Sequence, residues 1–259
     1  MIEQNFFEKI EQVDFTSEGH SYRTPVFYLD ATAISAGFLT PLQRLREILP
    51  SPRLQPLRAT PWHGVTVITA FEFRETDIGP YNEVAIAIPI TLDKSAPVFT
   101  GLRHHMAKGP MIYVHHLPVT TEIARYGGVE IYGFPKFIAK IDFAREEGWL
   151  HCHLAEGDRR ILTLSAKEID VKPEARWRSD CITVREGRLI RSEIMFNQKS
   201  LGVSRNRREV RLDLGDHPIS DELRSLNLGR MLELRYLPHY EAILSGPLES
   251  FALQEGKAS

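Results

Sequence analysis

Lys136 is the residue of this chain whose surroundings most favour chemistry. It follows the pair Phe134-Pro135 and precedes a mainly apolar run, 137–141. An ammonium group among aromatic and aliphatic neighbours is poorly solvated, which favours the neutral amine. A neutral lysine is a nucleophile that can form a Schiff base with a ketone. The opposing interpretation is a loop lysine that extends over apolar side chains with its ammonium in water.

The backbone around this lysine is expected to be irregular. Gly127, Gly128, Gly133 and Pro135 divide the stretch 127–142 into a turn, a short extended piece, a second turn and a strand. At pH 7 an unperturbed lysine is neutral in only about one molecule in 2,500. The fraction of neutral Lys136 would rise if its side chain packed against the aromatic and aliphatic side chains of this stretch.

Residues 130–136, Glu-Ile-Tyr-Gly-Phe-Pro-Lys, resemble the active-site stretch of the acetoacetate decarboxylase family. The segment 81–83, followed by 87–90, is similar to the family's glutamate-bearing segment. Arg23, near the start of a predicted strand, lies where the family carries an arginine. The C-terminal layout from His217 to Leu248 is also similar, so the resemblance covers most of the chain.

The resemblance implies a decarboxylase that acts on an acetoacetate-like β-keto acid without a metal or an organic cofactor. Lys136 would attack the ketone, and the protonated imine would accept the electron pair left when CO₂ departs. Glu83 would orient the substrate or transfer protons, and Arg23 would hold the substrate carboxylate. A homo-oligomer is also implied. The substrate pocket would include Phe134, Phe137 and Tyr81.

One position departs from the family pattern. Acetoacetate decarboxylase itself carries a second lysine directly after the first, and Phe137 stands there in this chain. Without that cation, desolvation alone must favour the neutral amine. Relatives of the family use the same lysine for aldol condensation and dehydration, and the replacement leaves that activity open. A third possibility is a barrel that binds a small ligand without turnover.

The elements that must position these residues are mostly strands. Their spacing and the tight turns between them favour one α+β domain over 1–259, mainly β, with an antiparallel β-barrel core, flanking strands and a few short helices. A barrel wider than its side chains can fill would provide a ligand cavity. Helices are expected at 2–13, 41–49 and 220–229. Strands are expected at 23–29, 65–73, 84–88, 111–119, 149–154, 160–166, 181–185 and 189–196.

The overall composition excludes several classes of partner. The net charge is −2, with charges of both signs interspersed, which argues against nucleic acid and acidic membrane surfaces. No apolar run is long enough to span a membrane, and the first residues lack the pattern of a signal peptide. We therefore expect a cytoplasmic protein whose partner is a small keto acid. Cys152 and Cys181 are expected to be reduced thiols, although one disulfide is also compatible with the sequence.

The histidines do not predict a metal site. His115 and His116 are neighbours on a predicted strand, so they are expected to face opposite sides and not to bind one ion together. His151 and His153 would share one face of a strand, but the sequence offers no third ligand beside them. No metal is expected.

Overall fold

The computed structural model describes residues 6–8, 10–17, 20–95, 98, 109–174 and 176–253. The described helices are α1 (Leu42–Ile48), α3 (Glu122–Tyr132), α4 (Pro218–Ser225) and the 3-10 helix η1 (Arg207–Glu209). The strands are β1 (Val13–Ser17), β2 (His20–Thr24), β3 (Val26–Pro41), β4 (Leu54–Pro56), β5 (His63–Thr76), β6 (Tyr81–Leu92), β7 (Met111–His116), β8 (Lys140–Glu146), β9 (Trp149–Glu156), β10 (Arg159–Lys167), β11 (Trp177–Arg185), β12 (Arg188–Asn197), β13 (Gly202–Ser204), β14 (Val210–Leu214), β15 (Met231–Leu244) and β16 (Glu249–Ala252).

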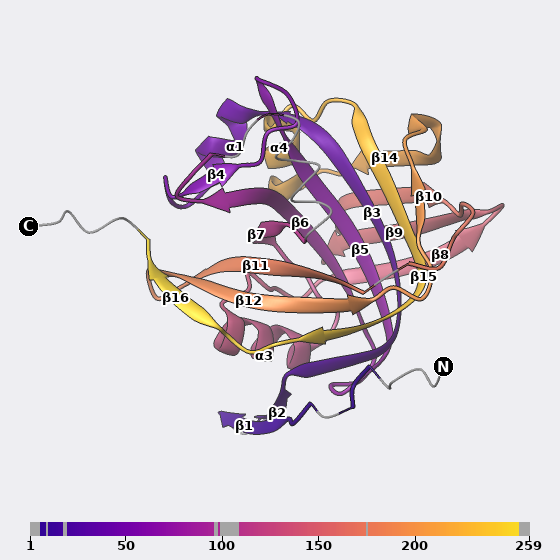
Figure 1. The fold of residues 1–259 in the computed structure, drawn as a ribbon. Helices are drawn as coiled ribbons and strands as arrows, with labels where there is room; N and C mark the ends of the chain where they lie inside the picture. The colour runs from indigo at the N-terminus through magenta and orange to yellow at the C-terminus, as the bar shows by residue number, and fades with distance from the viewer. Residues whose placement is uncertain are drawn as a thin grey trace, which may run out of the picture.

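The largest sheet closes into a ring. Its strands follow the order β15, β3, β5, β6, β7, β11 and β12, and β12 pairs back with β15 (Figure 1). The predicted α+β, mainly β class is confirmed. The expected antiparallel arrangement fails at one pair, because β7 and β11 are parallel. Parallel neighbours need a long crossover connection, and here the chain between them forms α3 and the strands β8 to β10.

A second, smaller sheet packs on the outside of this ring. It has the antiparallel order β14, β10, β9 and β8. Its apolar face shares one buried cluster with the outer face of the ring. Ile34, Ile68 and Ile86 come from the ring, whereas Leu154 and Leu164 come from the smaller sheet. This core excludes water from one side of the strands that carry the site.

Small side chains leave space inside the ring. Ala33 and Ser35 on β3, and Ala85 and Ala87 on β6, all line an internal cavity. Successive residues of a strand point to opposite faces, so each strand contributes every second residue to the interior. A ring lined by such short side chains cannot fill its own centre, and the expected ligand cavity is present.

The helices agree only in part with the sequence prediction. The expected helices at 41–49 and 220–229 correspond to α1 and α4, and α4 begins earlier, after a cap by His217. Of the helix expected at 2–13, residues 2–5 and 9 lie outside the described part. Residues 6–8 form a turn, and β1 begins at Val13. No helix among the described residues is long and apolar enough to cross a membrane.

Both cysteines are free and buried. Cys181 lies on β11 in the cavity lining, and Cys152 lies in the core between the two sheets. Burial raises the pKa of the Cys181 thiol to about 12, and burial also raises that of Cys152. Both sulfurs are therefore protonated at neutral pH, which makes them poor nucleophiles.

Candidate functional site

Lys136 is positioned by the end of a helix. Helix α3 ends at Tyr132 and is capped by Gly133, whose φ of 65° lies in the left-handed region that glycine adopts most easily. The backbone N–H groups of Gly133 and Phe134 donate to the carbonyls of Val129 and Gly128, both at 3.0 Å. The chain is thereby folded back over the helix, and the side chain of Lys136 lies against Gly128.

The predicted turn and extended piece over 127–132 are wrong, because these residues belong to α3. Gly127 and Gly128 do not break the chain, and the structure uses them for close packing. A Cβ on Gly127 would lie 2.8 Å from a carbon of the Tyr22 ring. A Cβ on Gly128 would lie 2.6 Å from Cε of Lys136 and 3.2 Å from its Nζ. Tertiary contacts therefore outweigh the low helix propensity of glycine.

Glu83 meets Lys136 inside the ring. It lies near the start of β6, and Lys136 Nζ donates a hydrogen bond of 2.8 Å to its Oε2. The two side chains are only 5% and 11% exposed. The segment after β7 joins their backbones, since Leu117 N–H donates to Pro135 and Val84 N–H donates to Pro118. The two residues that the sequence singled out are thus held together by both side chains and backbone.

The surroundings of Lys136 act on its charge in two directions. A buried ammonium loses solvation, whereas a carboxylate at hydrogen-bond distance stabilises a positive charge, and Lys136 has both surroundings. The ring centres of Tyr81 and Phe134 lie 5.6 Å and 5.7 Å from Nζ, which also favours a cation. Desolvation is therefore not the only influence. The amine can become neutral without leaving a lone buried charge if its proton passes to Glu83.

The cavity beside this pair is almost entirely apolar. It has a volume of about 180 Å³, and both Lys136 and Glu83 line it. Aromatic and aliphatic side chains form most of its wall, including Phe71, Phe73, Phe134, Ile112, Ile194 and Leu237. A wall of this kind excludes water and strengthens the electrostatic effects of the few charged groups that remain.

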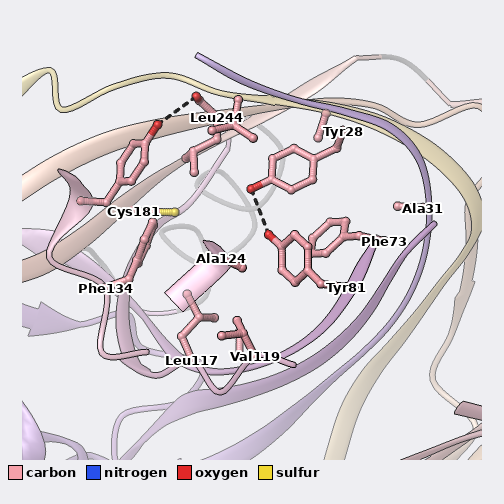
Figure 2. Packing of buried hydrophobic residues seen from close by; sticks show 14 of the residues in the cluster. Tyr28, Ala31, Phe73, Tyr81, Leu117, Val119, Ala124, Phe134, Cys181 and Leu244 are labelled. Carbon is pink, nitrogen blue, oxygen red and sulfur yellow. Dashed lines mark hydrogen bonds between the residues drawn. The ribbon is translucent and has the colours of Figure 1, made fainter. Parts of the chain in front are cut away.

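Three buried tyrosines contribute hydroxyl groups near Glu83. Tyr81 donates to the hydroxyl of Tyr28 at 3.3 Å, and Figure 2 shows the two rings pointing toward one another. Burial, with the charge of Glu83, raises the pKa of both Tyr28 and Tyr240. Among the described residues, Tyr240 Oη has no hydrogen-bond partner although it is buried. These neutral hydroxyls are able to donate to an oxygen of a bound ligand.

Tyr81 and Phe134 lie beside Lys136, but Arg23 and Phe137 lie elsewhere. Arg23 is on the separate β1–β2 hairpin, where its side chain is 64% exposed and lies 3.4 Å from Asp14. It is not among the residues that line the cavity. Phe137 packs into the core between the two sheets, because neighbouring residues of extended chain point to opposite sides.

Arg235 is a cavity residue that sequence reasoning missed. Arg235 on β15 pairs with Ser35 on β3. Ser35 in turn pairs with Thr69 on β5, and Thr69 pairs with Ala85 on β6, the strand that carries Glu83. Three strand spacings, about 14 Å along the sheet, therefore separate it from β6. An inward-pointing arginine at this position faces the charged pair from the opposite wall of the ring.

The guanidinium of Arg235 keeps part of its binding capacity free. Its Nε donates to Glu233 at 2.9 Å, and its Cζ lies 5.7 Å from the centre of the Trp177 ring. Within the described part of the chain, its two terminal nitrogens have no hydrogen-bond partner. The side chain is 22% exposed, which places it between the cavity and solvent. The sequence signal is weak, because Arg235 and Glu233 are both charged residues in the otherwise apolar stretch 231–237.

The histidines on β7 also differ from expectation. Both His115 and His116 contact the carboxylate of Glu222 on α4, so the prediction that they face opposite sides is wrong. His151 and His153 do share one face of β9, with ring centres 6.2 Å apart. In the part of the chain that the structure describes, these two have no third ligand beside them.

Comparison with known proteins agrees with this architecture. The structure resembles an acetoacetate decarboxylase from Legionella pneumophila, with a TM-score of 0.67 and 15% identity over 87% of this chain and 88% of that chain. It also resembles the enduracididine biosynthesis enzyme MppR complexed with pyruvate, with a TM-score of 0.60 and 15% identity over 89% and 91% of the two chains. At these identities the likeness concerns the fold.

A third similar structure is an acetoacetate decarboxylase-like enzyme from Sphingomonas wittichii RW1, with a TM-score of 0.55 and 14% identity over 88% of this chain and 94% of that chain. No curated protein sequence matches the chain significantly. The family model described as acetoacetate decarboxylase (ADC) matches residues 14–248. Because this match spans most of the sequence, the chain belongs to the acetoacetate decarboxylase family.

Proposed function

We propose that the chain is a Schiff-base enzyme that decarboxylates an acetoacetate-like β-keto acid at Lys136. The observation that carries this proposal is the buried pair of Lys136 and Glu83, 2.8 Å apart, at the wall of an apolar cavity. A reactive amine needs a base beside it and protection from water, and this pair has both. Membership of the family supports the assignment.

The chemistry begins with a proton transfer inside the pair. Glu83 takes a proton from the Lys136 ammonium, which leaves a neutral amine next to a neutral acid. The amine attacks the keto carbon to give a carbinolamine, and Glu83 returns a proton to the hydroxyl that leaves as water. The resulting protonated imine is linked to Lys136 through a C=N bond. Glu83 is suited to both transfers because it already lies within hydrogen-bond distance of Nζ.

Loss of CO₂ then needs no further group with a charge. The C–C bond to the carboxylate breaks, its electron pair moves into the imine, and the iminium nitrogen becomes a neutral enamine. A proton taken up from solvent, which the overall reaction consumes, adds to the enamine carbon. Addition of water to the resulting iminium then releases the ketone and restores the Lys136 ammonium. The apolar wall favours this step, because a buried carboxylate is converted into an uncharged gas. The free hydroxyl of Tyr240 is available to hold the substrate oxygen.

We propose Arg235 for the role that the family resemblance implies for Arg23. Arg235→Ala is expected to raise KM with little change in kcat, because a charge-assisted pair with the substrate carboxylate contributes about 1.5–3 kcal/mol. The measurement is steady-state kinetics on a β-keto acid. Arg23→Ala is the matched control, since its exposed side chain lies outside the cavity lining. A higher KM in Arg23→Ala but not in Arg235→Ala would reverse the assignment.

An aldol condensation at the same lysine is the second candidate. MppR, whose fold this chain shares, has been solved with the condensation product of pyruvate and imidazole 4-carboxaldehyde. The same imine of Lys136 could lose a proton instead of CO₂ and attack an aldehyde. Product analysis after adding a keto acid with and without an aldehyde separates the two activities. Release of CO₂ without an aldehyde supports the decarboxylase.

The test of the Schiff base is chemical trapping. Sodium borohydride added together with a small β-keto acid, or with its ketone product, is expected to reduce the imine to a stable secondary amine on Lys136. Peptide mass mapping identifies the labelled residue. Lys140 is the internal control, because it is 72% exposed and lies 3.4 Å from Asp142 rather than in the cavity.

Labelling at another lysine, or no labelling at all, would contradict the trapping prediction. Labelling at Lys140, or at no lysine across several keto acids, would leave a cavity that binds ligands without covalent chemistry. Labelling at Lys136 without release of CO₂ would instead support the aldol reaction. The comparison therefore separates the Schiff base itself from the reaction that follows it.

A further inference from the structure

A bulge in the ring brings two histidines to one side of β7. Ala87 on β6 pairs with Val114, whereas the preceding residue Ile86 pairs with His116. His115 is therefore an extra residue opposite one position of β6. A β-bulge of this kind breaks the alternation of side chains and re-aims one of them. This explains why two neighbours that were expected to face opposite sides meet the same partner.

That partner is Glu222 on α4. Nε2 of His115 contacts one carboxylate oxygen, and Nε2 of His116 lies 3.0 Å from the other. The three ligand atoms all lie within 4.8 Å of one another. The side chains of His115, His116 and Glu222 are 16%, 21% and 29% exposed, so the cluster is shielded but open to small solutes.

We propose that His115, His116 and Glu222 bind a divalent transition metal of the zinc class. The ligands are Nε2 of each imidazole and one oxygen of the carboxylate. Two neutral imidazoles and a carboxylate form a ligand set that suits Zn²⁺ and Co²⁺, with a fourth position left for water. Binding replaces the hydrogen bonds between the imidazoles and Glu222, and any proton on a ligating nitrogen is released to solvent.

The electrostatics of Glu222 are consistent with this role. Burial alone would raise its pKa, but hydrogen bonds from His115 and His116 outweigh burial and lower the pKa to about 2. The carboxylate is therefore ionised at neutral pH and offers a negative ligand to a cation. In the described part of the chain, no other group of three metal-ligating side chains comes as close together.

The site lies outside the cavity. It is next to the segment that joins the backbones beside Lys136 and Glu83. Residues 117–119 directly follow His116. Leu117 N–H donates to the Pro135 carbonyl at 3.2 Å, and the Pro118 carbonyl accepts from Val84 at 3.1 Å. A metal here would fix α4 to the end of β7, and through this segment it would stabilise the backbone beside Lys136 and Glu83. Its role is therefore structural, and the proposal does not depend on the reaction.

Cobalt binding to the full chain tests the proposal. The protein is prepared without a histidine tag, treated with a chelator and titrated with Co²⁺ at pH 7.5. We expect one Co²⁺ per chain, with the visible absorption bands of a four- or five-coordinate site. Zn²⁺ should displace the Co²⁺ and raise Tm, because a ligand that binds only the folded state stabilises it.

Matched variants locate the ion. Glu222→Gln replaces the anionic ligand by a neutral amide, and His115→Ala removes an imidazole. Each is expected to weaken Co²⁺ binding at least about tenfold. The double variant His151→Ala/His153→Ala removes the other histidine pair and should bind as the wild type does. Glu222→Gln keeps the shape of the side chain, and its Tm without metal shows whether it is folded. Absence of visible bands, equal binding by Glu222→Gln, or loss of binding in the His151/His153 variant would each overturn the site.

Discussion

Replacing Lys136 by arginine is expected to reduce kcat on a keto acid at least about a thousandfold, as removal of a catalytic nucleophile does in other enzymes. A guanidinium remains protonated near neutral pH and cannot attack a ketone. It can still pair with Glu83, so the buried carboxylate keeps a cationic partner. The measurements are release of CO₂, borohydride labelling and Tm. A Lys136→Arg variant that is folded and still turns over would exclude the Schiff base.

A second variant displaces the amine without removing it. In Gly128→Ala the new methyl group would lie 2.6 Å from Cε of Lys136, so the lysine side chain must move. A displacement of about 1 Å at a reacting atom can cost about a hundredfold in rate, and we expect a loss of about 10- to 100-fold. Gly127→Ala is the control on the same helix, because it meets Tyr22 instead. Equal kcat losses in both variants would assign the effect to the helix.

Local sequence signals and the family resemblance together pointed to the proposed pair of Lys136 and Glu83. Lys136 follows a short aromatic and proline turn, and Glu83 opens a strand that is apolar on both faces. Each of these patterns lies within a few residues, and the family resemblance linked them. The structure places the two side chains in hydrogen-bond contact. The contact also alters the expectation, because a carboxylate lies beside the amine in addition to the apolar side chains.

Long-range geometry explains what the sequence did not show. The choice between Arg23 and Arg235 depends on which strand closes the ring, and closure occurs through pairs far apart in the chain, β12 with β15 and β7 with β11. Neither pairing has a local pattern. The bulge at His115 also has no local sequence pattern, because a register shift is a property of two paired strands. The helix around Gly128 was missed because its glycines are required by side chains from other segments.

Glu83→Gln is expected to lower kcat by about 100- to 10,000-fold, the range associated with general acid and base catalysis. The amide cannot accept the proton of the Lys136 ammonium or return it to the leaving hydroxyl. Its shape is close to that of the carboxylate, so the cavity should keep its size. Glu72→Gln is the matched control, because Glu72 lies on neighbouring β5 and pairs with Arg74 and Arg145 outside the cavity lining. Steady-state kinetics on both variants measures the difference.

Replacing Glu83 by glutamine also removes a negative charge beside Lys136, and this loss would not slow the reaction. A carboxylate beside an ammonium stabilises the charged form, and Glu83→Gln removes this partner of Lys136. If Glu83 only held the ammonium in place, Glu83→Gln would turn over as fast as the wild type or faster. If Glu83 moves protons, imine formation slows in the variant, so borohydride labelling at Lys136 and CO₂ release should slow together. Slow labelling and slow turnover in a folded variant therefore support proton transfer by Glu83, and fast turnover excludes it.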